Sequence, residues 1–240
     1  MIVLNEWLRR QAAELQVVLT GRALLQLERY ATLLQEWNQS LNLTTISEAP
    51  EIYELHFLDS LSVALAVDMT QAHNLIDVGT GAGFPGLVLA IAFPATRVTL
   101  VESVNKKAWF LQAVVAELDL ADQVQVVCER AEIIGQQVAY RQQFDLAVAR
   151  AVARLAVLAE YCLPLVRVGG CFVAQKGPEI EAELAEASRC FALLGGAAVH
   201  VDNWLLPSGA GRTIVRVNKR DNSPDQFPRR PGMPSKRPLL

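Results

Sequence analysis

The stretch LIDVGTGAGFPGLVLAIA, residues 75–92, places a short apolar run directly before a glycine-rich segment and a second apolar run directly after it. Glycine occupies positions 79, 81, 83 and 86 of this stretch. A strand that turns at once into a helix points the first N–H groups of the helix into the connecting loop, and glycines let a ligand approach the backbone closely. The stretch therefore predicts a strand, a ligand-binding loop and a helix.

Strand-like and helical runs alternate from residue 74 onward, which predicts an α/β fold. The last two strand-like runs are joined by WLLPSGAGR, residues 204–212, which is too short for a crossover helix, so these two strands must pair antiparallel. We expect a Rossmann-like sheet of seven strands with a reversed last pair, the plan of class I S-adenosylmethionine methyltransferases rather than the all-parallel dinucleotide fold. The seven runs are 75–78, 97–102, 124–129, 144–150, 171–176, 197–201 and 213–219.

The chain divides by composition into three parts. Residues 1–70 show the three-to-four spacing of apolar residues that is typical of helices, with Thr20 as a helix cap, and predict a helical extension of about three helices. Residues 71–218 form the expected methyltransferase domain. Residues 219–240 hold five prolines and six basic against two acidic residues, so we expect an irregular basic tail of net charge about +4 on a body of about −7.

Composition limits the classes of protein that this chain can belong to. With 240 residues and 52% hydrophobic residues the chain can bury a large core, which excludes disorder of the whole chain. Neither an apolar run of transmembrane length nor a signal peptide is evident, so we expect a soluble cytoplasmic protein without membrane partners. The four cysteines lack C-x-x-C spacing, which predicts buried, reduced thiols and no metal site.

Two cofactors suit a loop of this kind, and the spacing of the glycines separates them. A dinucleotide loop needs G-x-G-x-x-G directly after the strand, but counting from Gly79 puts Phe84 at the sixth position. Counting from Gly81 instead leaves Gly79 and Thr80 between strand and motif. Read from Asp77, the loop is D-x-G-x-G-x-G, and a carboxylate there would repel a pyrophosphate and attract an ammonium group. The sequence therefore favours S-adenosyl-L-methionine over NAD.

Acidic residues at the ends of the next two strands indicate how a nucleoside would be held. Glu102 lies about twenty residues beyond the glycines, where a carboxylate can accept both ribose hydroxyls. The segment Glu129–Glu132 follows the third strand, where methyltransferases commonly place a polar group against the adenine edge. Both S-adenosylmethionine and NAD contain such a nucleoside, so these residues predict a ribose and an adenine without choosing between the cofactors.

The segment after the fourth strand narrows the reaction. It contains neither an N/D-P-P-Y/F motif, which would grip an exocyclic amine, nor the Pro-Cys nucleophile needed for attack on a pyrimidine carbon. An acceptor with an available lone pair remains, such as a ring nitrogen, for which positioning and exclusion of water would supply most of the rate. Basic residues expected near the carboxyl ends of the strands fit a nucleic-acid backbone, together with the tail: Lys106, Lys107, Arg130, Arg150, Arg154 and Lys176.

Several motifs together resemble one family. They are residues 75–91 of the glycine stretch, EWNQSLNLTTI at 36–46, HFLDSL at 56–61, VARAVA at 148–153 and FPRRPGMPSKRPL at 227–239. In this combination the chain resembles the ribosomal RNA small subunit methyltransferase G family over nearly its whole length. The resemblance implies transfer of a methyl group from S-adenosylmethionine to guanine N7 in small-subunit (16S) rRNA, with the rRNA or the ribosomal particle as partner.

The resemblance also implies which residues meet the cofactor. Guanine N7 carries no proton, so no catalytic base is expected and no catalytic residue is assigned. His56 and Asp59 match an H-x-x-D-S segment of the family, and we interpret them as a contact between helix and sheet. The implied contacts are Gly79, Gly81 and Phe84 in the loop, Glu102, Ser103 and Val104 beside the ribose, Ala131 and Glu132 at the adenine, and Arg150 closing the site.

Three other functions stay open at the level of sequence. A methyltransferase with a small-molecule or protein acceptor is compatible with the acidic body and disfavoured by the basic tail. An NAD(P)-dependent oxidoreductase is disfavoured by Asp77 and by the reversed last strand pair. A non-catalytic RNA-binding assembly factor could keep the same fold. With no self-association motif in view, we expect a monomer.

Overall fold

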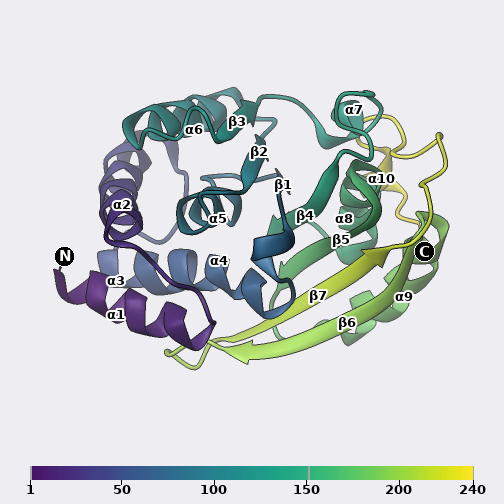
Figure 1. Ribbon diagram of the computed structural model, residues 1–240. Helices are drawn as coiled ribbons and strands as arrows, with labels where there is room; N and C mark the ends of the chain where they lie inside the picture. Colours follow the sequence, from purple (N-terminus) through teal and green to yellow (C-terminus); the bar gives the residue numbers. More distant parts are fainter. Residues whose placement is uncertain (1, 151, 240) are drawn as a thin grey trace.

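The computed structural model describes residues 2–150 and 152–239 and contains one seven-stranded sheet. The strand order is β3-β2-β1-β4-β5-β7-β6, in which β7 pairs antiparallel with both β5 and β6 and the remaining pairs are parallel. This order confirms the predicted class I methyltransferase fold with its reversed last pair (Figure 1). The strands are β1 (Asn74–Val78), β2 (Arg97–Val101), β3 (Val124–Val127), β4 (Phe144–Arg150), β5 (Val166–Lys176), β6 (Gly196–Leu205) and β7 (Gly211–Lys219).

Helices cover both faces of the sheet and enclose two hydrophobic clusters. On one face α5 and α6 pack with α1, α2 and the segment from α3 to η2; on the other face lie α8 and α9 (Figure 1). The helices before the sheet are α1 (Ile2–Glu14), α2 (Gly21–Leu41), α3 (Ala49–Glu51), the π-helix η1 (Ile52–Leu58), α4 (Asp59–Leu61) and the 3₁₀ turns η2 (Ser62–Leu65) and η3 (Met69–Gln71). The later ones are α5 (Gly86–Ala92), α6 (Asn105–Glu117), α7 (Ala131–Ile134), α8 (Leu155–Cys162), η4 (Leu163–Leu165), α9 (Glu181–Leu193) and α10 (Met233–Lys236).

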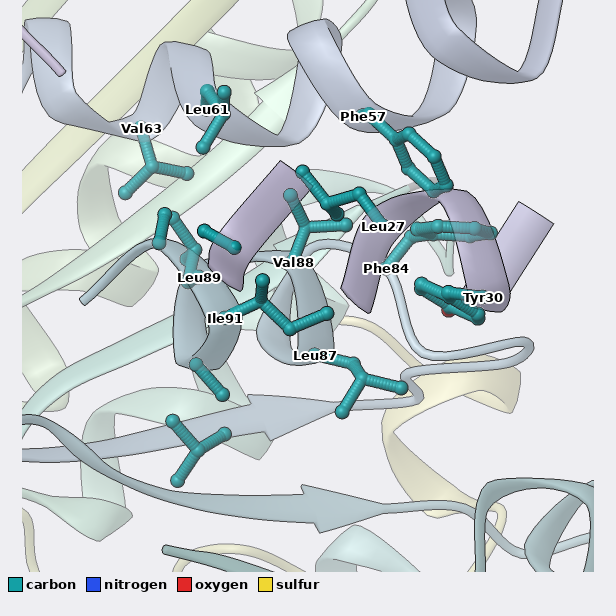
Figure 2. Packing of buried hydrophobic residues seen from close by; sticks show 14 of the residues in the cluster. Leu27, Tyr30, Phe57, Leu61, Val63, Phe84, Leu87, Val88, Leu89 and Ile91 are labelled. Atoms are coloured by element: carbon teal, nitrogen blue, oxygen red, sulfur yellow. The ribbon is translucent and has the colours of Figure 1, made fainter. Parts of the chain in front are cut away.

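The N-terminal helices hold the glycine loop in place. Thr20 caps α2 as predicted, because its hydroxyl accepts the N–H of Ala23 at 3.1 Å. From the same helix, Tyr30 reaches the loop: its hydroxyl donates to the Ala82 carbonyl, and its ring stacks on Phe84 with centroids 5.4 Å apart. Figure 2 shows the rings of Tyr30, Phe84 and Phe57 close together, and the ring centroids of Tyr30 and Phe57 are 5.5 Å apart. The helices and the glycine loop therefore share one core, and the division of the chain at residues 70 and 218 stays a prediction.

The C-terminal tail is packed against the body and, apart from the short helix α10, is irregular as expected. Its prolines allow the short helix α10. Contacts of Lys219 and Arg229 with residues far away in the sequence hold the tail to the body. Lys219 is 2% exposed and donates to the carbonyls of Leu163 and Leu194, and burial lowers its pKa to about 7. Arg229 forms an ion pair with the fully buried Glu160. Two of the six basic residues of the tail therefore bind groups within the fold and are not part of a free basic arm.

Two smaller expectations, the burial of the cysteines and the start of β5, differ from the structure. The thiol of Cys128 is exposed, so the prediction that all four cysteines are buried is wrong; the other three are buried, and all four are free. The 3₁₀ turn η4 leads straight into β5, which starts five residues earlier than its apolar run suggested. Across the described part of the chain, no helix combines the length and the apolar character that crossing a bilayer requires.

Candidate functional site

The glycine loop is shaped by backbone conformations that favour glycine. Gly79, Gly81 and Gly83 have φ angles of 71°, 62° and 105°, in the left-handed region. At Gly83 a Cβ would lie 2.5 Å from the Tyr30 hydroxyl, so only glycine fits under α2. At Gly81, by contrast, a Cβ would meet nothing within 4 Å. The loop is therefore tightly packed at Gly83 and open at Gly81, which leaves backbone at Gly81 accessible to a ligand.

Asp77 anchors the loop from the end of β1. Its Oδ2 accepts the Thr80 hydroxyl at 2.6 Å and the Gly86 N–H at 2.8 Å, while Oδ1 is buried and has no hydrogen-bond partner among the described residues. Burial raises the pKa of Asp77 to about 6, against the opposing effect of these two hydrogen bonds. A buried carboxylate oxygen without a partner suits a cationic ligand group, such as the ammonium for which the sequence analysis selected this residue.

Glu102, at the end of β2, is tied to the same loop. Its Oε2 accepts the Gly81 N–H at 3.1 Å and its Oε1 accepts the Val104 N–H at 2.8 Å. Each carboxylate oxygen can accept a second hydrogen bond, so the group can still receive two ribose hydroxyls. The structure thus connects three of the predicted cofactor residues, Gly81, Glu102 and Val104, through a single carboxylate.

A cavity of about 230 Å³ opens beside this loop, at the carboxyl ends of β1, β2 and β3; we call it the glycine-loop cavity. It brings together the predicted residues Gly79, Ser103, Ala131 and Glu132. It also contains residues that the sequence analysis did not name, among them Tyr161 and Ser235. Its full lining is Val78, Gly79, Val101, Ser103, Glu129, Arg130, Ala131, Glu132, Val152, Ala153, Tyr161 and Ser235.

A second cavity, of about 330 Å³, lies at the carboxyl ends of β4 and β5; we call it the arginine cavity. Side chains from η1, α4, both of these strands and the start of β7 surround it. Its lining is Leu55, His56, Asp59, Arg150, Gln175, Lys176, Gly177 and Arg212. The segment after β4 links the two cavities, since Arg150 lines one and Val152 and Ala153 line the other. Lys176 also donates to the Ala153 carbonyl at 3.0 Å.

A buried ion cluster forms one wall of the arginine cavity. Asp59 is 3% exposed, and its two oxygens pair with Arg150 at 3.0 Å and Arg212 at 3.1 Å. Burial lowers the pKa of Arg150, an effect that Asp59 opposes. One carboxylate between two guanidinium groups leaves the cluster with a net positive charge. The cluster therefore has no spare negative charge.

His56 belongs to the same wall and is neutral. Its ring stacks on Phe84 with centroids 4.3 Å apart, and its two nitrogens lie 3.2 Å from Arg150 Nη2 and 2.9 Å from the Thr44 hydroxyl. Burial, with the Arg150 charge in addition, lowers the pKa of His56 to about 3. The contacts of His56 and Asp59 fit the interpretation of their segment as a contact between helix and sheet.

Gln175 is the polar residue that the sequence analysis missed at this cavity. It is 3% exposed, and its Nε2 donates to the Asp59 carbonyl at 2.5 Å and to the Ser62 hydroxyl at 2.9 Å. Because a carbonyl can only accept, these bonds fix which end of the amide is nitrogen. Its Oε1 is buried without a partner among the described residues. Gln175, which lines the arginine cavity, thus has a hydrogen-bond acceptor that the described protein groups leave unused.

Five of the nine predicted cofactor residues do not line the glycine-loop cavity: Gly81, Glu102 and Val104 belong to the hydrogen-bonded loop beside it, and Phe84 and Arg150 lie elsewhere. The ring of Phe84 is 5% exposed and packs between Tyr30 and His56, so any contact with a ligand would come from its backbone. Arg150 lies in the arginine cavity and is paired with Asp59, and its roles in closing the cofactor site and in holding phosphate stay predictions. Gln175 and Arg212 carry no sequence signal of their own, because each lies within an otherwise ordinary strand.

The other candidate phosphate-binding residues differ in ion pairing and in exposure. Arg154 pairs with Glu186, and Lys176 pairs with Glu183 at 3.0 Å. Lys106 and Arg130 are exposed, and Lys107 is half-buried. Within residues 2–150 and 152–239 no group of His, Cys, Asp and Glu is placed to hold a metal ion.

Solved structures of methyltransferases share this fold. An O-methyltransferase from Bacillus cereus, determined in complex with SAH, superposes with a TM-score of 0.57 at 19% identity, covering 80% of this chain and 91% of that one. A SAM-dependent O-methyltransferase from Thermotoga maritima gives a TM-score of 0.54 at 16% identity, covering 80% and 73%. At such low identity these similarities support the fold alone.

Full-length relatives are far more similar. The chain is 46% identical over 240 residues to the ribosomal RNA small subunit methyltransferase G of Pelotomaculum thermopropionicum, with all of both chains covered. It is 46% identical over 224 residues to that of Geobacillus kaustophilus, covering 93% of this chain and 94% of the relative. The family model for rRNA small subunit methyltransferase G matches residues 23–208. These matches confirm the resemblance seen in the motifs: the chain belongs to the rRNA small subunit methyltransferase G family.

Proposed function

We propose that this protein transfers a methyl group from S-adenosylmethionine to N7 of a guanine in 16S rRNA. One observation carries the proposal beyond family membership: the glycine-loop cavity adjoins the arginine cavity at Ala153, which lines the first and accepts a hydrogen bond from Lys176, which lines the second. Methyl transfer needs this arrangement, because donor and acceptor must meet in line with water excluded.

The glycine-loop cavity would hold the cofactor. Glu102 would accept the ribose hydroxyls, Asp77 would face the methionine ammonium, and the start of α7 would meet the adenine. The bound cofactor supplies a methyl group on a positively charged sulfur. An NAD(P) cofactor fits less well, because Asp77 is buried beside the loop where a pyrophosphate would lie and because the sheet has the reversed strand of the methyltransferase fold.

The arginine cavity would hold the acceptor base. Guanine carries hydrogen-bond donors at N1 and at its 2-amino group, and the unused Oε1 of Gln175 can accept one of them. Adenine presents an acceptor at N1 and a donor at its 6-amino group, so an oxygen that faces N1 of the base would disfavour adenine. Neutral His56 and the paired Asp59 are not available as bases, which agrees with an acceptor nitrogen that carries no proton. The cavity therefore positions the acceptor base, and the nucleophile is the ring nitrogen of that base.

The RNA backbone would be held by exposed cations near the same edge of the sheet, such as Lys106 and Arg130. Residues Arg230, Lys236 and Arg237 of the tail are also exposed. The substrate is then the small-subunit rRNA or its ribosomal particle, and the enzyme acts as a monomer in the cytoplasm.

A transfer assay with purified components tests the proposal. The protein is incubated with S-adenosylmethionine that carries a labelled methyl group. The substrates are small subunits, and free 16S rRNA, from cells that lack the protein. The rRNA is then digested and its nucleosides are separated by chromatography. The label is expected in 7-methylguanosine. Label in another nucleoside would contradict the N7 assignment, and failure to label either small subunits or free 16S rRNA would contradict the proposed substrate.

A further inference from the structure

The end of the chain returns to the carboxyl edge of the sheet, although residues 1–219 already complete it. Figure 1 shows the yellow tail passing beside α7 and α8, with α10 next to α8. Arg141 fixes the first part of the tail by donating to the carbonyls of Ser223 and Phe227, at 2.8 and 2.6 Å. The tail therefore follows a defined path toward the glycine-loop cavity.

A buried ion pair fixes the middle of the tail. Glu160, in α8, is fully buried, and its Oε1 accepts both the backbone N–H and the Nε of Arg229 at 2.8 Å. Its Oε2 accepts Arg229 Nη2 at 2.6 Å. A buried carboxylate matched by three donors from one residue sets the position of the chain at Arg229, six residues before Ser235.

Two further contacts join the tail to the cavity wall itself. The Gly232 N–H donates to Glu132 Oε1 at 2.9 Å, and the hydroxyls of Ser235 and Tyr161 share a hydrogen bond of 3.0 Å. Glu132, Tyr161 and Ser235 all line the glycine-loop cavity. The Glu132 carboxylate, which the family resemblance assigned to the adenine, is thus also bound to the tail.

We propose that Gly232–Ser235 is part of the cofactor-binding site and walls its adenine end, with Ser235 and Tyr161 as positioning residues. Their hydroxyls can donate to, or accept from, the edge of an adenine ring. The tail then acts on the cofactor, whereas its basic composition alone suggested a phosphate-binding arm. The inference rests on the proposed assignment of the glycine-loop cavity to S-adenosylmethionine.

One substitution with a matched control tests this role in the full-length protein. Ser235→Trp places a large ring at the cavity wall, whereas Gln226→Trp places the same ring on an exposed position of the same tail. Calorimetry with S-adenosylhomocysteine is expected to show at least a tenfold loss of affinity for Ser235→Trp and less than a twofold change for Gln226→Trp. Unfolding in urea checks that both variants fold like the wild type. Equal affinities for the two folded variants would overturn the proposal.

Hydrogen exchange of the unmodified protein gives a second test that does not depend on a variant. Adding S-adenosylhomocysteine is expected to slow exchange at the backbone amides of Gly232, Met233 and Ser235, together with those of the glycine loop. Protection of the loop without protection of the tail would overturn this inference and leave the proposed function intact. Failure of the wild-type protein to bind S-adenosylhomocysteine would instead refute the cofactor assignment itself.

Discussion

The two adjoining cavities are built from different kinds of groups. The glycine loop beside the first cavity is organised by backbone: its N–H groups bind Asp77 and Glu102, and its glycines adopt left-handed conformations. The arginine cavity is organised by side chains that are distant in the sequence, with Asp59 joined to Arg150 and Arg212. A backbone-built loop can be recognised from consecutive residues, whereas a side-chain cluster becomes visible only after folding.

This difference implies that substitutions in the two cavities should have separable effects. Changes around the glycine loop should affect cofactor affinity, and changes in the arginine cavity should affect stability or the use of the acceptor. The following predictions test this separation, beginning with the largest expected effect.

Asp59→Ala should destabilise the fold most. It leaves Arg150 and Arg212 with an uncompensated buried charge, and removing one partner of a buried ion pair costs about 3–5 kcal/mol. Urea unfolding measures the loss. Glu117→Ala is the control, because the Glu117–Arg29 pair is exposed and such pairs contribute about 1 kcal/mol or less. Equal losses for the two variants would mean that the cluster does not hold the cavity together.

Glu102→Ala should weaken cofactor binding with little effect on the arginine cavity. Loss of the hydrogen bonds to the ribose and to Gly81 corresponds to about 1–3 kcal/mol, or roughly 5- to 150-fold in Kd. Calorimetry with S-adenosylhomocysteine measures the change, and Glu51→Ala, at an exposed position of α3 outside both cavities, serves as the control. Unchanged affinity in Glu102→Ala would remove this residue from the site.

Gln175→Met should impair use of the acceptor while leaving cofactor affinity unchanged. It removes the Oε1 acceptor, and the expected loss in kcat/KM with small subunits is roughly tenfold. Ser62→Ala is the matched control, since it removes a partner of Gln175 Nε2 and keeps Oε1. If Gln175→Met loses no more activity than Ser62→Ala, the amide oxygen has no role in recognising the base.

Cofactor affinity should fall as the pH is lowered through about 6. Burial raises the pKa of Asp77 to about 6, so the carboxyl becomes protonated and neutral below that pH and no longer attracts the ammonium. Above it the carboxylate is charged and the affinity reaches its plateau. Calorimetry between pH 5 and 8 measures the curve, and Asp77→Asn should flatten it. A wild-type curve without a step in this range would exclude Asp77 as the partner of the ammonium.

The sequence was informative where structure is local. Short apolar runs and the brief 204–212 connection predicted the sheet and its reversed pair. The sequence also singled out Asp77 and Glu102 as ligand contacts, which stay predictions, but it did not show that both residues bind N–H groups of the loop. The arginine cavity escaped detection because Gln175 and Arg212 reach Asp59 only through tertiary contacts.

In the tail, too, the tertiary partners of the residues could not be predicted from the sequence. Its charge and prolines are local features and suggested a free basic arm, but Lys219 and Arg229 act through Leu163, Leu194 and Glu160, which are far away in the sequence. Composition reports how many charges a segment carries and does not show which of them are already paired in the fold.

Mapping of 7-methylguanine by chemical cleavage of 16S rRNA, from cells with and without this protein, tests the central claim most directly. We predict that cleavage at one guanine occurs only in cells that contain the protein. This cleavage returns when the wild-type protein is restored and is weaker when Glu102→Ala is supplied instead. Identical cleavage patterns in the two strains would contradict methyl transfer to guanine N7 in 16S rRNA.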